Sequence, residues 1–182
     1  MSFRYEVRLS GEGGQGLVLA GKVLAEAAAI YDDKNATQSQ SYGPEARGGA
    51  SRSDVIISDD DIDYPKAVNI DLLLALTQES VNRYCKDLKG DGMLLVDEDA
   101  VSTMPEGTFR MFKVPIISTA RDTVGRVLVA NIVALGVITE LAGVVSGQAV
   151  ESAILARVPK GTEELNLRAF KAGVDVAKSL NL

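Results

Sequence analysis

The sequence predicts one α/β domain over residues 1–182, Rossmann-like, with a mostly parallel sheet, flanking helices and a helical C-terminal region. Strand-like and helix-like stretches alternate along the first half of the chain, which is the order that packs helices against a parallel sheet. Residues 70–76 are apolar without alternation, as in strands that are covered on both faces. The chain has 182 residues, 46% of them hydrophobic, so it can bury one sizeable core and needs no second domain.

The elements are expected in a simple order. They are a strand at residues 3–9, a helix at 17–31, strands at 50–58 and 70–76, a helix at 80–88 behind an N-cap at Thr77, a strand at 93–96, a short strand within 108–117, helical stretches at 120–126 and 127–145, a helix from Ser146 to residue 156, and a last helix from Thr162. The triplet at 90–92 is expected to be a turn before a strand. It does not match the magnesium-binding segment of thiamine diphosphate enzymes, because no paired Asn follows it.

A glycine-rich turn between the first strand and the first helix is the strongest motif. Its members are Gly11, Glu12, Gly13, Gly14, Gln15 and Gly16. Their spacing fits G-x-G-x-x-G, in which the glycines permit a tight turn, close approach of a ligand to bare backbone, and close packing of helix on strand. Free N–H groups at the start of the helix would face an anion. The glycines and Gln15 are therefore candidate contacts to a phosphate-like group or to a partner's cofactor; the alternative is a turn with a structural role only.

The region after the first helix does not favour NAD. A dinucleotide site places an Asp or Glu about 20 residues beyond the motif to hold a ribose hydroxyl. Residues 35–40 contain no acid, and Asp32 and Asp33 fall earlier, in the expected loop after the helix.

A polar segment at residues 37–49 precedes the strand at 50–58 and is expected to be a loop. Its candidate contacts to a ligand or partner are Ser41, Tyr42, Glu45, Arg47, Gly48 and Gly49. Arg47 followed by two glycines offers a guanidinium beside exposed amides, which suits a phosphate or a carboxylate. An ordinary surface loop is the alternative.

The composition excludes several kinds of function. A net charge of −6 argues against nucleic acid as a partner. The chain has no His and one Cys, so it cannot ligate an iron–sulfur cluster or a structural zinc, and it lacks the commonest general base. No residue is assigned a catalytic or metal-binding role; the acids at 59–63 are expected to form a solvated turn, and Cys85 to lie half-buried on a helix. The lack of a disulfide pair and of a leader favours the cytoplasm.

The apolar stretch at 127–145 is expected to be a core or interface helix and not a membrane span, because it contains Asn131 and Glu140 and lacks a flanking positive cluster. Its Gly and Ala residues would let another helix approach closely. It is the best candidate for a packing surface, including a contact between two copies of the chain.

Four stretches together resemble the gamma subunit of the 2-oxoacid:ferredoxin oxidoreductases, in the same order and over nearly the whole chain. They are residues 11–16, residues 41–49, residues 131–136, and Lys160 with residues 166–170.

The resemblance implies a Rossmann-like subunit of a multisubunit enzyme that decarboxylates a 2-oxoacid oxidatively, forms acyl-coenzyme A and passes electrons to ferredoxin. Thiamine diphosphate, Mg²⁺ and [4Fe-4S] clusters are then expected on alpha and beta subunits and on a ferredoxin-like delta subunit, and none on this chain. Coenzyme A is the shared substrate, and this chain is expected to form its side of the site and to be inactive alone. A free-standing nucleotide-binding or regulatory module without catalysis is the alternative.

Overall fold

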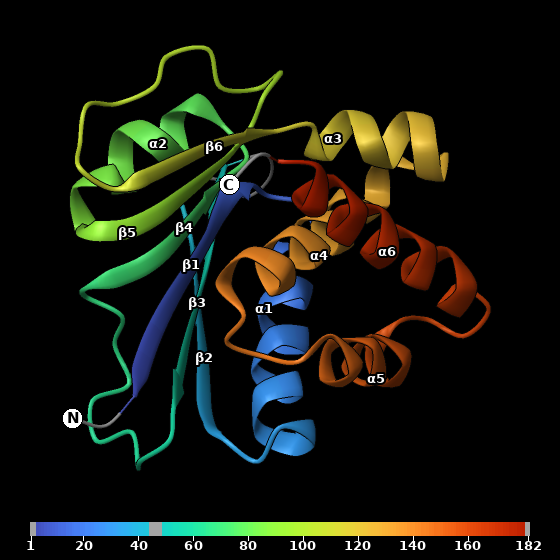
Figure 1. Ribbon diagram of the computed structural model, residues 1–182, viewed down its shortest axis with the longest axis horizontal. Helices are drawn as coiled ribbons and strands as arrows, with labels where there is room; N and C mark the ends of the chain where they lie inside the picture. The colour runs from blue at the N-terminus through green and yellow to red at the C-terminus, as the bar shows by residue number, and fades with distance from the viewer. Residues whose placement is uncertain (1–2, 44–48, 181–182) are drawn as a thin grey trace.

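A computed structural model describes residues 3–43 and 49–180 of the chain. The described part contains a six-stranded sheet in the order β2-β3-β1-β4-β5-β6 (Figure 1). The strands are β1 (Arg4–Glu12), β2 (Asn35–Tyr42), β3 (Ala50–Ser58), β4 (Ile70–Ala75), β5 (Leu88–Asp97) and β6 (Arg110–Val114). The helices are α1 (Leu17–Glu26, continued to Tyr31), α2 (Gln78–Tyr84), α3 (Ile116–Ser118, continued to Val124), α4 (Ala130–Ala142), α5 (Gly147–Arg157) and α6 (Glu163–Ser179). The predicted α/β class is confirmed.

The sheet is mixed, with its parallel part on one side. β1, β4, β5 and β6 pair in parallel, whereas β3 lies antiparallel between β1 and β2. β2 therefore runs in the same direction as β1, and β3 alone runs the other way. The mostly parallel sheet of the sequence prediction holds, but the inserted antiparallel strand was not foreseen.

The loop predicted at residues 37–49 was wrong for its first part. Residues 35–42 form an eight-residue edge strand whose side chains are exposed or partly exposed. A strand at the edge of a sheet need not be apolar, because its stability comes from the backbone pairing with β3 along its whole length. The polar composition of this segment therefore reflected exposure and not a lack of regular structure.

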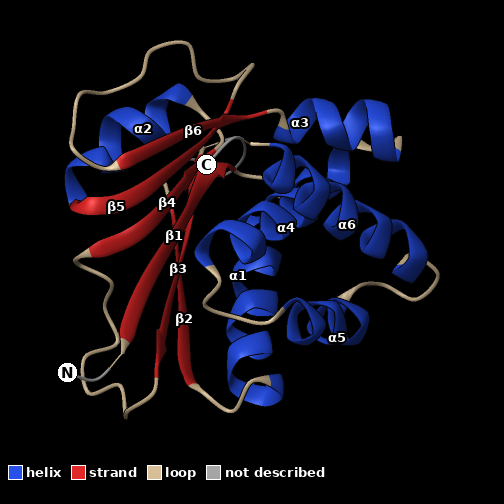
Figure 2. Cartoon of the chain, viewed as in Figure 1, coloured by secondary structure: helices blue, strands red, loops and turns tan. Residues whose placement is uncertain are grey.

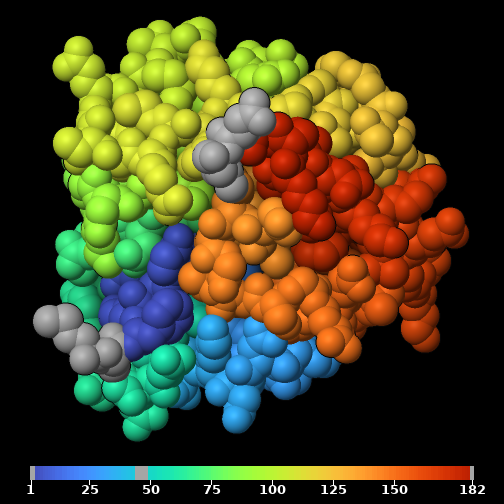
Figure 3. All heavy atoms as spheres, viewed as in Figure 1, coloured from blue at the N-terminus to red at the C-terminus, as the bar shows by residue number. Residues whose placement is uncertain are grey.

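Helices cover both faces of the sheet (Figure 2). α1, α4, α5 and α6 lie on one face, and their apolar side chains form the larger core with Val7, Leu9 and Val55 from the strands. α2 lies on the other face, where a smaller core contains Leu73, Leu94 and Tyr84. In the space-filling view, the orange and red atoms of the C-terminal helices form one side of the face shown, with the light-blue atoms that follow α1 visible below them (Figure 3).

The expected packing helix is α4, and its partner is α6. Residues 130–138 of α4 are all buried. A Cβ atom built on Gly136 would lie 2.2 Å from the carbonyl oxygen of Phe170, and the two glycines Gly136 and Gly173 face each other across the contact. Close approach of a second helix, predicted from the small residues, is thus confirmed within the chain. Among the described residues, no helix is long and apolar enough to span a bilayer.

Several boundaries differ from the prediction; β1, expected to end at residue 9, runs on to Glu12, and α4 is shorter than the expected 127–145. The helix expected to reach residue 88 ends as an α-helix at Tyr84, and the triplet at 90–92 lies inside β5 instead of in a turn before it. Leu88 already pairs with Ile70, and the register shifts before Met93 pairs with Leu72. The triplet therefore falls in the irregular part of the strand between these two pairs, where glycine is tolerated.

Candidate functional site

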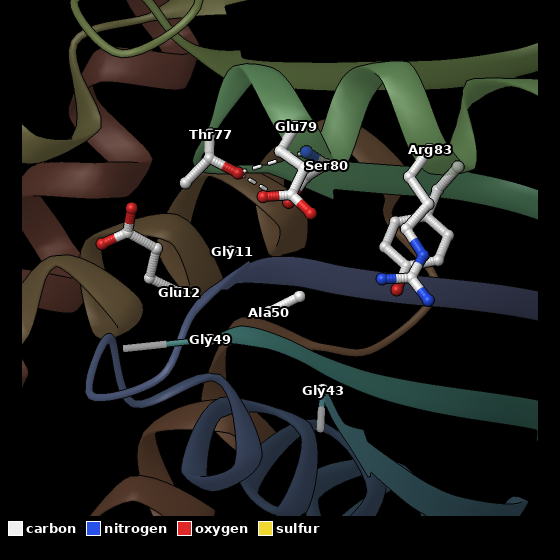
Figure 4. A pocket seen from close by; sticks show the side chains of 10 residues that line it. Gly11, Glu12, Gly43, Gly49, Ala50, Thr77, Glu79, Ser80 and Arg83 are labelled. Carbon is white, nitrogen blue, oxygen red and sulfur yellow. Dashed lines mark hydrogen bonds between the residues drawn. The ribbon is translucent and has the colours of Figure 1, made fainter. Parts of the chain in front are cut away.

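The candidate site lies where the chain changes from one face of the sheet to the other. α1 follows β1 on one face, and α2 follows β4 on the opposite face, although β1 and β4 are parallel neighbours. In open α/β sheets, ligands bind at the carboxyl ends of strands at such a switch point. A cavity of about 120 Å³ lies there (Figure 4). It is lined by Gly11, Glu12, Gly43, Gly49, Ala50, Thr77, Glu79, Ser80, Arg83 and Tyr84.

The glycine turn is held by backbone hydrogen bonds. Gly13 N donates to the carbonyl of Gly49 at 2.8 Å, which joins the turn to the residue that leads into β3. The side-chain carbonyl of Gln15 accepts from the Glu12 amide at 2.7 Å. Gly14 and Gly16 have φ values of 94° and 73°, in the region that L side chains rarely adopt. The turn is therefore rigid and keeps its glycines for geometric reasons.

The structure separates the predicted site residues into groups. Gly11 and Gly49 line the cavity. Gly13, Gly14 and Gln15 are in the turn beside it without lining it. Gly16 lines a different, mostly apolar cavity of about 280 Å³ between the starts of α1, α4 and α6.

The second predicted segment is only partly described. Ser41 and Tyr42 lie at the end of β2, with Tyr42 62% exposed, and neither lines the cavity. Glu45, Arg47 and Gly48 lie outside the described residues.

The acids nearest to the end of the first helix do not face the site. Asp32 accepts hydrogen bonds from the backbone amide and the hydroxyl of Ser146, at 2.6 and 2.7 Å. The same hydroxyl accepts from the Ala149 amide, so Ser146 is the expected N-cap of α5. Asp32 therefore fixes the start of α5.

Sequence reasoning missed the contribution of α2 to the site. Thr77 was predicted as its N-cap, and its hydroxyl accepts from the Ser80 amide at 3.2 Å. Ser80 is buried, and its hydroxyl also accepts from Ser10 of β1 at 2.8 Å. Glu79, Arg83 and Tyr84 follow on the same helix and line the cavity. The available signal was their position directly after the buried strand β4, next to the carboxyl end of β1.

Three arginines surround the ring of Tyr84. The guanidinium carbons of Arg8, Arg52 and Arg83 lie 5.1, 5.5 and 5.4 Å from the ring centroid. Arg8 is buried and binds Asp54 at 2.9 Å and Asp87 at 2.6 Å. Burial opposes the charge of Arg8, but the bonds to these two carboxylates outweigh it and raise the pKa of Arg8. The ring of Tyr84 thus lies among three guanidinium groups, two of which pair with the carboxylates of Asp54 and Asp87.

The cavity contains groups for binding more than for catalysis. Its polar groups are two carboxylates, one guanidinium, hydroxyls and glycine backbone, and the chain has no His. Among residues 3–43 and 49–180, no three potential ligands gather as they would around a metal ion. This set can hold a polar, charged ligand.

Comparison with known proteins identifies the family. The family described as pyruvate ferredoxin/flavodoxin oxidoreductase matches residues 6–176. The chain belongs to this family. The resemblance found in the sequence motifs is therefore confirmed, and the chain is of the gamma-subunit type.

Individual relatives of the pyruvate ferredoxin/flavodoxin oxidoreductase family agree. The 2-oxoglutarate synthase subunit KorC of Methanocaldococcus jannaschii is 53% identical, over 99% of this chain and 97% of its own length. The solved gamma subunit of keto/oxoacid ferredoxin oxidoreductase from Geobacter sulfurreducens has 55% identity and a TM-score of 0.87, over 96% of this chain and 99% of that one. The ketoisovalerate oxidoreductase subunit VorA of Methanothermobacter thermautotrophicus is 33% identical over 94% of this chain, which spans only 36% of VorA.

Proposed function

We propose that this chain is the gamma subunit of a 2-oxoglutarate:ferredoxin oxidoreductase complex. The supporting observation is the identity of 53% with a 2-oxoglutarate synthase subunit over both full lengths, against 33% with the ketoisovalerate enzyme. In this proposal, alpha and beta subunits hold the thiamine diphosphate, Mg²⁺ and [4Fe-4S] clusters, and a ferredoxin-like delta subunit hands electrons to ferredoxin. The complex works in the cytoplasm.

The contribution of this chain is to form the coenzyme A side of the shared site. Its cavity lies at the switch point and is bounded by the glycine turn and by residues on both sides of the segment 44–48. At about 120 Å³ it is smaller than a site that encloses a whole cofactor, which typically measures roughly 300–1,000 Å³. The cavity is therefore suited to one end of a ligand whose reacting end lies on a partner subunit.

The substrate is tested with the complex purified through a tag on this chain. Acyl-coenzyme A formation is assayed anaerobically with a viologen dye and with 2-oxoglutarate, pyruvate or 2-oxoisovalerate. The proposal expects the highest kcat/KM for 2-oxoglutarate and strict dependence on coenzyme A. A chain that is isolated alone and without colour, and that binds a nucleotide tightly, would instead support a free-standing binding module.

The site is tested by filling the cavity. Ala50 is the first residue of β3 and lines the cavity. Ala50→Leu should raise the KM for coenzyme A by about tenfold, the effect of roughly 1.4 kcal/mol, with little change in the KM for the oxoacid. Ala100→Leu, the same change in the turn after β5, is the control and should alter neither value. Equal KM values for coenzyme A in both variants would show that this cavity does not hold the substrate.

A further inference from the structure

Arg83 is the cation of the cavity that the rest of the structure leaves available. Arg8 is neutralised by Asp54 and Asp87, and Arg52 also lies 3.5 Å from Asp54. Among the described residues, no carboxylate lies within ion-pair distance of Arg83. Three guanidinium groups around Tyr84 thus share two carboxylates, and the unshared positive charge belongs to the residue that lines the cavity.

The cavity is polarised along its length. Figure 4 shows Glu12 beside the glycine turn and Arg83 at the opposite end of the cavity, with Glu79 between them. An anionic group is repelled by the two carboxylates and attracted at the Arg83 end, because Arg83 carries the positive charge that the carboxylates of Asp54 and Asp87 leave unshared. The acidic end suits hydroxyl or amino donors. The part of a ligand that enters this cavity should therefore carry a phosphate at its Arg83 end. It should carry hydrogen-bond donors at its other end, next to the two carboxylates.

We propose that Arg83 binds the 3′-phosphate of coenzyme A and thereby selects coenzyme A against its dephospho form. The inference rests on the proposed function, since it takes coenzyme A as the ligand of this cavity. A 3′-phosphate is a terminal monoester with a charge near −2, which a guanidinium can bind through two hydrogen bonds. The pyrophosphate of coenzyme A lies in the middle of the molecule, with bulky groups on both sides, and fits a cavity of about 120 Å³ less well.

The test compares coenzyme A with dephospho-coenzyme A in the whole complex. With the native chain, the KM should be lower for coenzyme A. Arg83→Gln should raise the KM for coenzyme A by about tenfold to a hundredfold, the range that corresponds to losing a charged hydrogen-bond partner. The KM for dephospho-coenzyme A should stay the same, so the preference between the two substrates should disappear. Arg83→Lys keeps the charge and should restore part of the preference.

The matched control is Lys86→Gln, which removes an exposed cation one turn further on, at a different cavity. It should change neither KM. A rise in KM that is equal for the two substrates would overturn the inference and place Arg83 near the pyrophosphate or in a structural role. An unchanged KM for coenzyme A would also overturn it.

The inference can fail while the proposed function stands. If Ala50→Leu raises the KM for coenzyme A and Arg83→Gln does not alter the preference, the cavity holds coenzyme A but Arg83 does not bind the 3′-phosphate. If neither variant affects coenzyme A, the proposed site fails as well. Thermal unfolding of each purified variant chain shows whether the substitution has altered the fold, a change that would affect both substrates alike.

Discussion

At the scale of single residues, the centre of the sheet contains a charged network in place of a uniformly apolar face. Arg8 and Asp54 are 3% and 5% exposed and are joined by two hydrogen bonds, at 2.9 and 3.1 Å. Arg8 also donates to the carbonyl of Ala67, at 3.3 Å. Removing such charged groups from water is costly. The hydrogen bonds and the attraction between Arg8 and Asp54 compensate for this cost only while both side chains are present. The network therefore stabilises the part of the sheet that packs against Tyr84, a residue that lines the candidate cavity.

Breaking this pair should be strongly destabilising. Asp54→Asn leaves the buried charge of Arg8 with Asp87 alone, so we expect a loss of about 3 kcal/mol in the free energy of unfolding, the lower end of the range for a buried pair. Urea unfolding followed by circular dichroism measures it. The control is Asp122→Asn, whose partner Arg121 is exposed; its urea midpoint should not move. Equal midpoints for the two variants would contradict the role given to Asp54.

Tyr5 should make the stability depend on pH in the alkaline range. Desolvation, with a further contribution from the charge of Asp71, raises the pKa of Tyr5 to about 12 from its ordinary value of 10.0. Between these values the unfolded chain loses the phenol proton and the folded chain keeps it. Stability is therefore retained below pH 10 and falls as the pH rises toward 12. Tyr5→Phe should show a smaller fall in urea midpoint between pH 9 and about 11.5; an identical fall would show that Tyr5 is not responsible.

At the scale of elements, the contact between α4 and α6 determines how the helical layer packs. A Cβ atom at Gly173 would lie 2.0 Å from the carbonyl oxygen of Val133, and one at Gly136 would meet the backbone of α6. Both nearest atoms are backbone, which cannot move aside as a side chain can. The small residues of α4 were visible in the sequence, but the identity of the partner helix was not.

Adding a methyl group at this contact should push the two helices apart. We expect Gly136→Ala to lower the free energy of unfolding by at least about 1–3 kcal/mol, the usual cost of overpacking. Gly147→Ala is the matched control, because no atom lies within 4 Å of the added Cβ at the start of α5; it should be neutral or slightly stabilising. Thermal unfolding of the two variants gives the comparison. A stable Gly136→Ala protein would mean that the two helices can separate at little cost.

At the scale of the whole molecule, the chain belongs to a family whose members are subunits of multisubunit oxidoreductases. The described cavity, at about 120 Å³, is small for a site that encloses a whole cofactor. In VorA, a relative of the same family, about two thirds of the polypeptide lies outside the match to this chain. Both observations support a domain that acts next to another one.

The isolated chain should accordingly be folded and inactive. Purified alone, it should give a cooperative thermal transition but no dye reduction with 2-oxoglutarate and coenzyme A. Adding the alpha, beta and delta subunits should restore turnover, and leaving this chain out of the mixture should abolish it. Dye reduction by the isolated chain would refute the accessory role, and full activity without it would show that it is dispensable.

The sequence by itself determined the fold class, the glycine turn, the caps at Thr77 and Ser146, and the family, because these depend on local spacing and residue type. Only the tertiary structure decided that residues 35–42 form an edge strand, that β3 inserts between β1 and β2, and that Glu79 and Arg83 line the same cavity as Gly11. These features depend on backbone pairing between distant segments and on the switch of α2 to the opposite face. Neither leaves a periodic signal in the residues concerned, since a polar edge strand and a helix start resemble ordinary loop sequence.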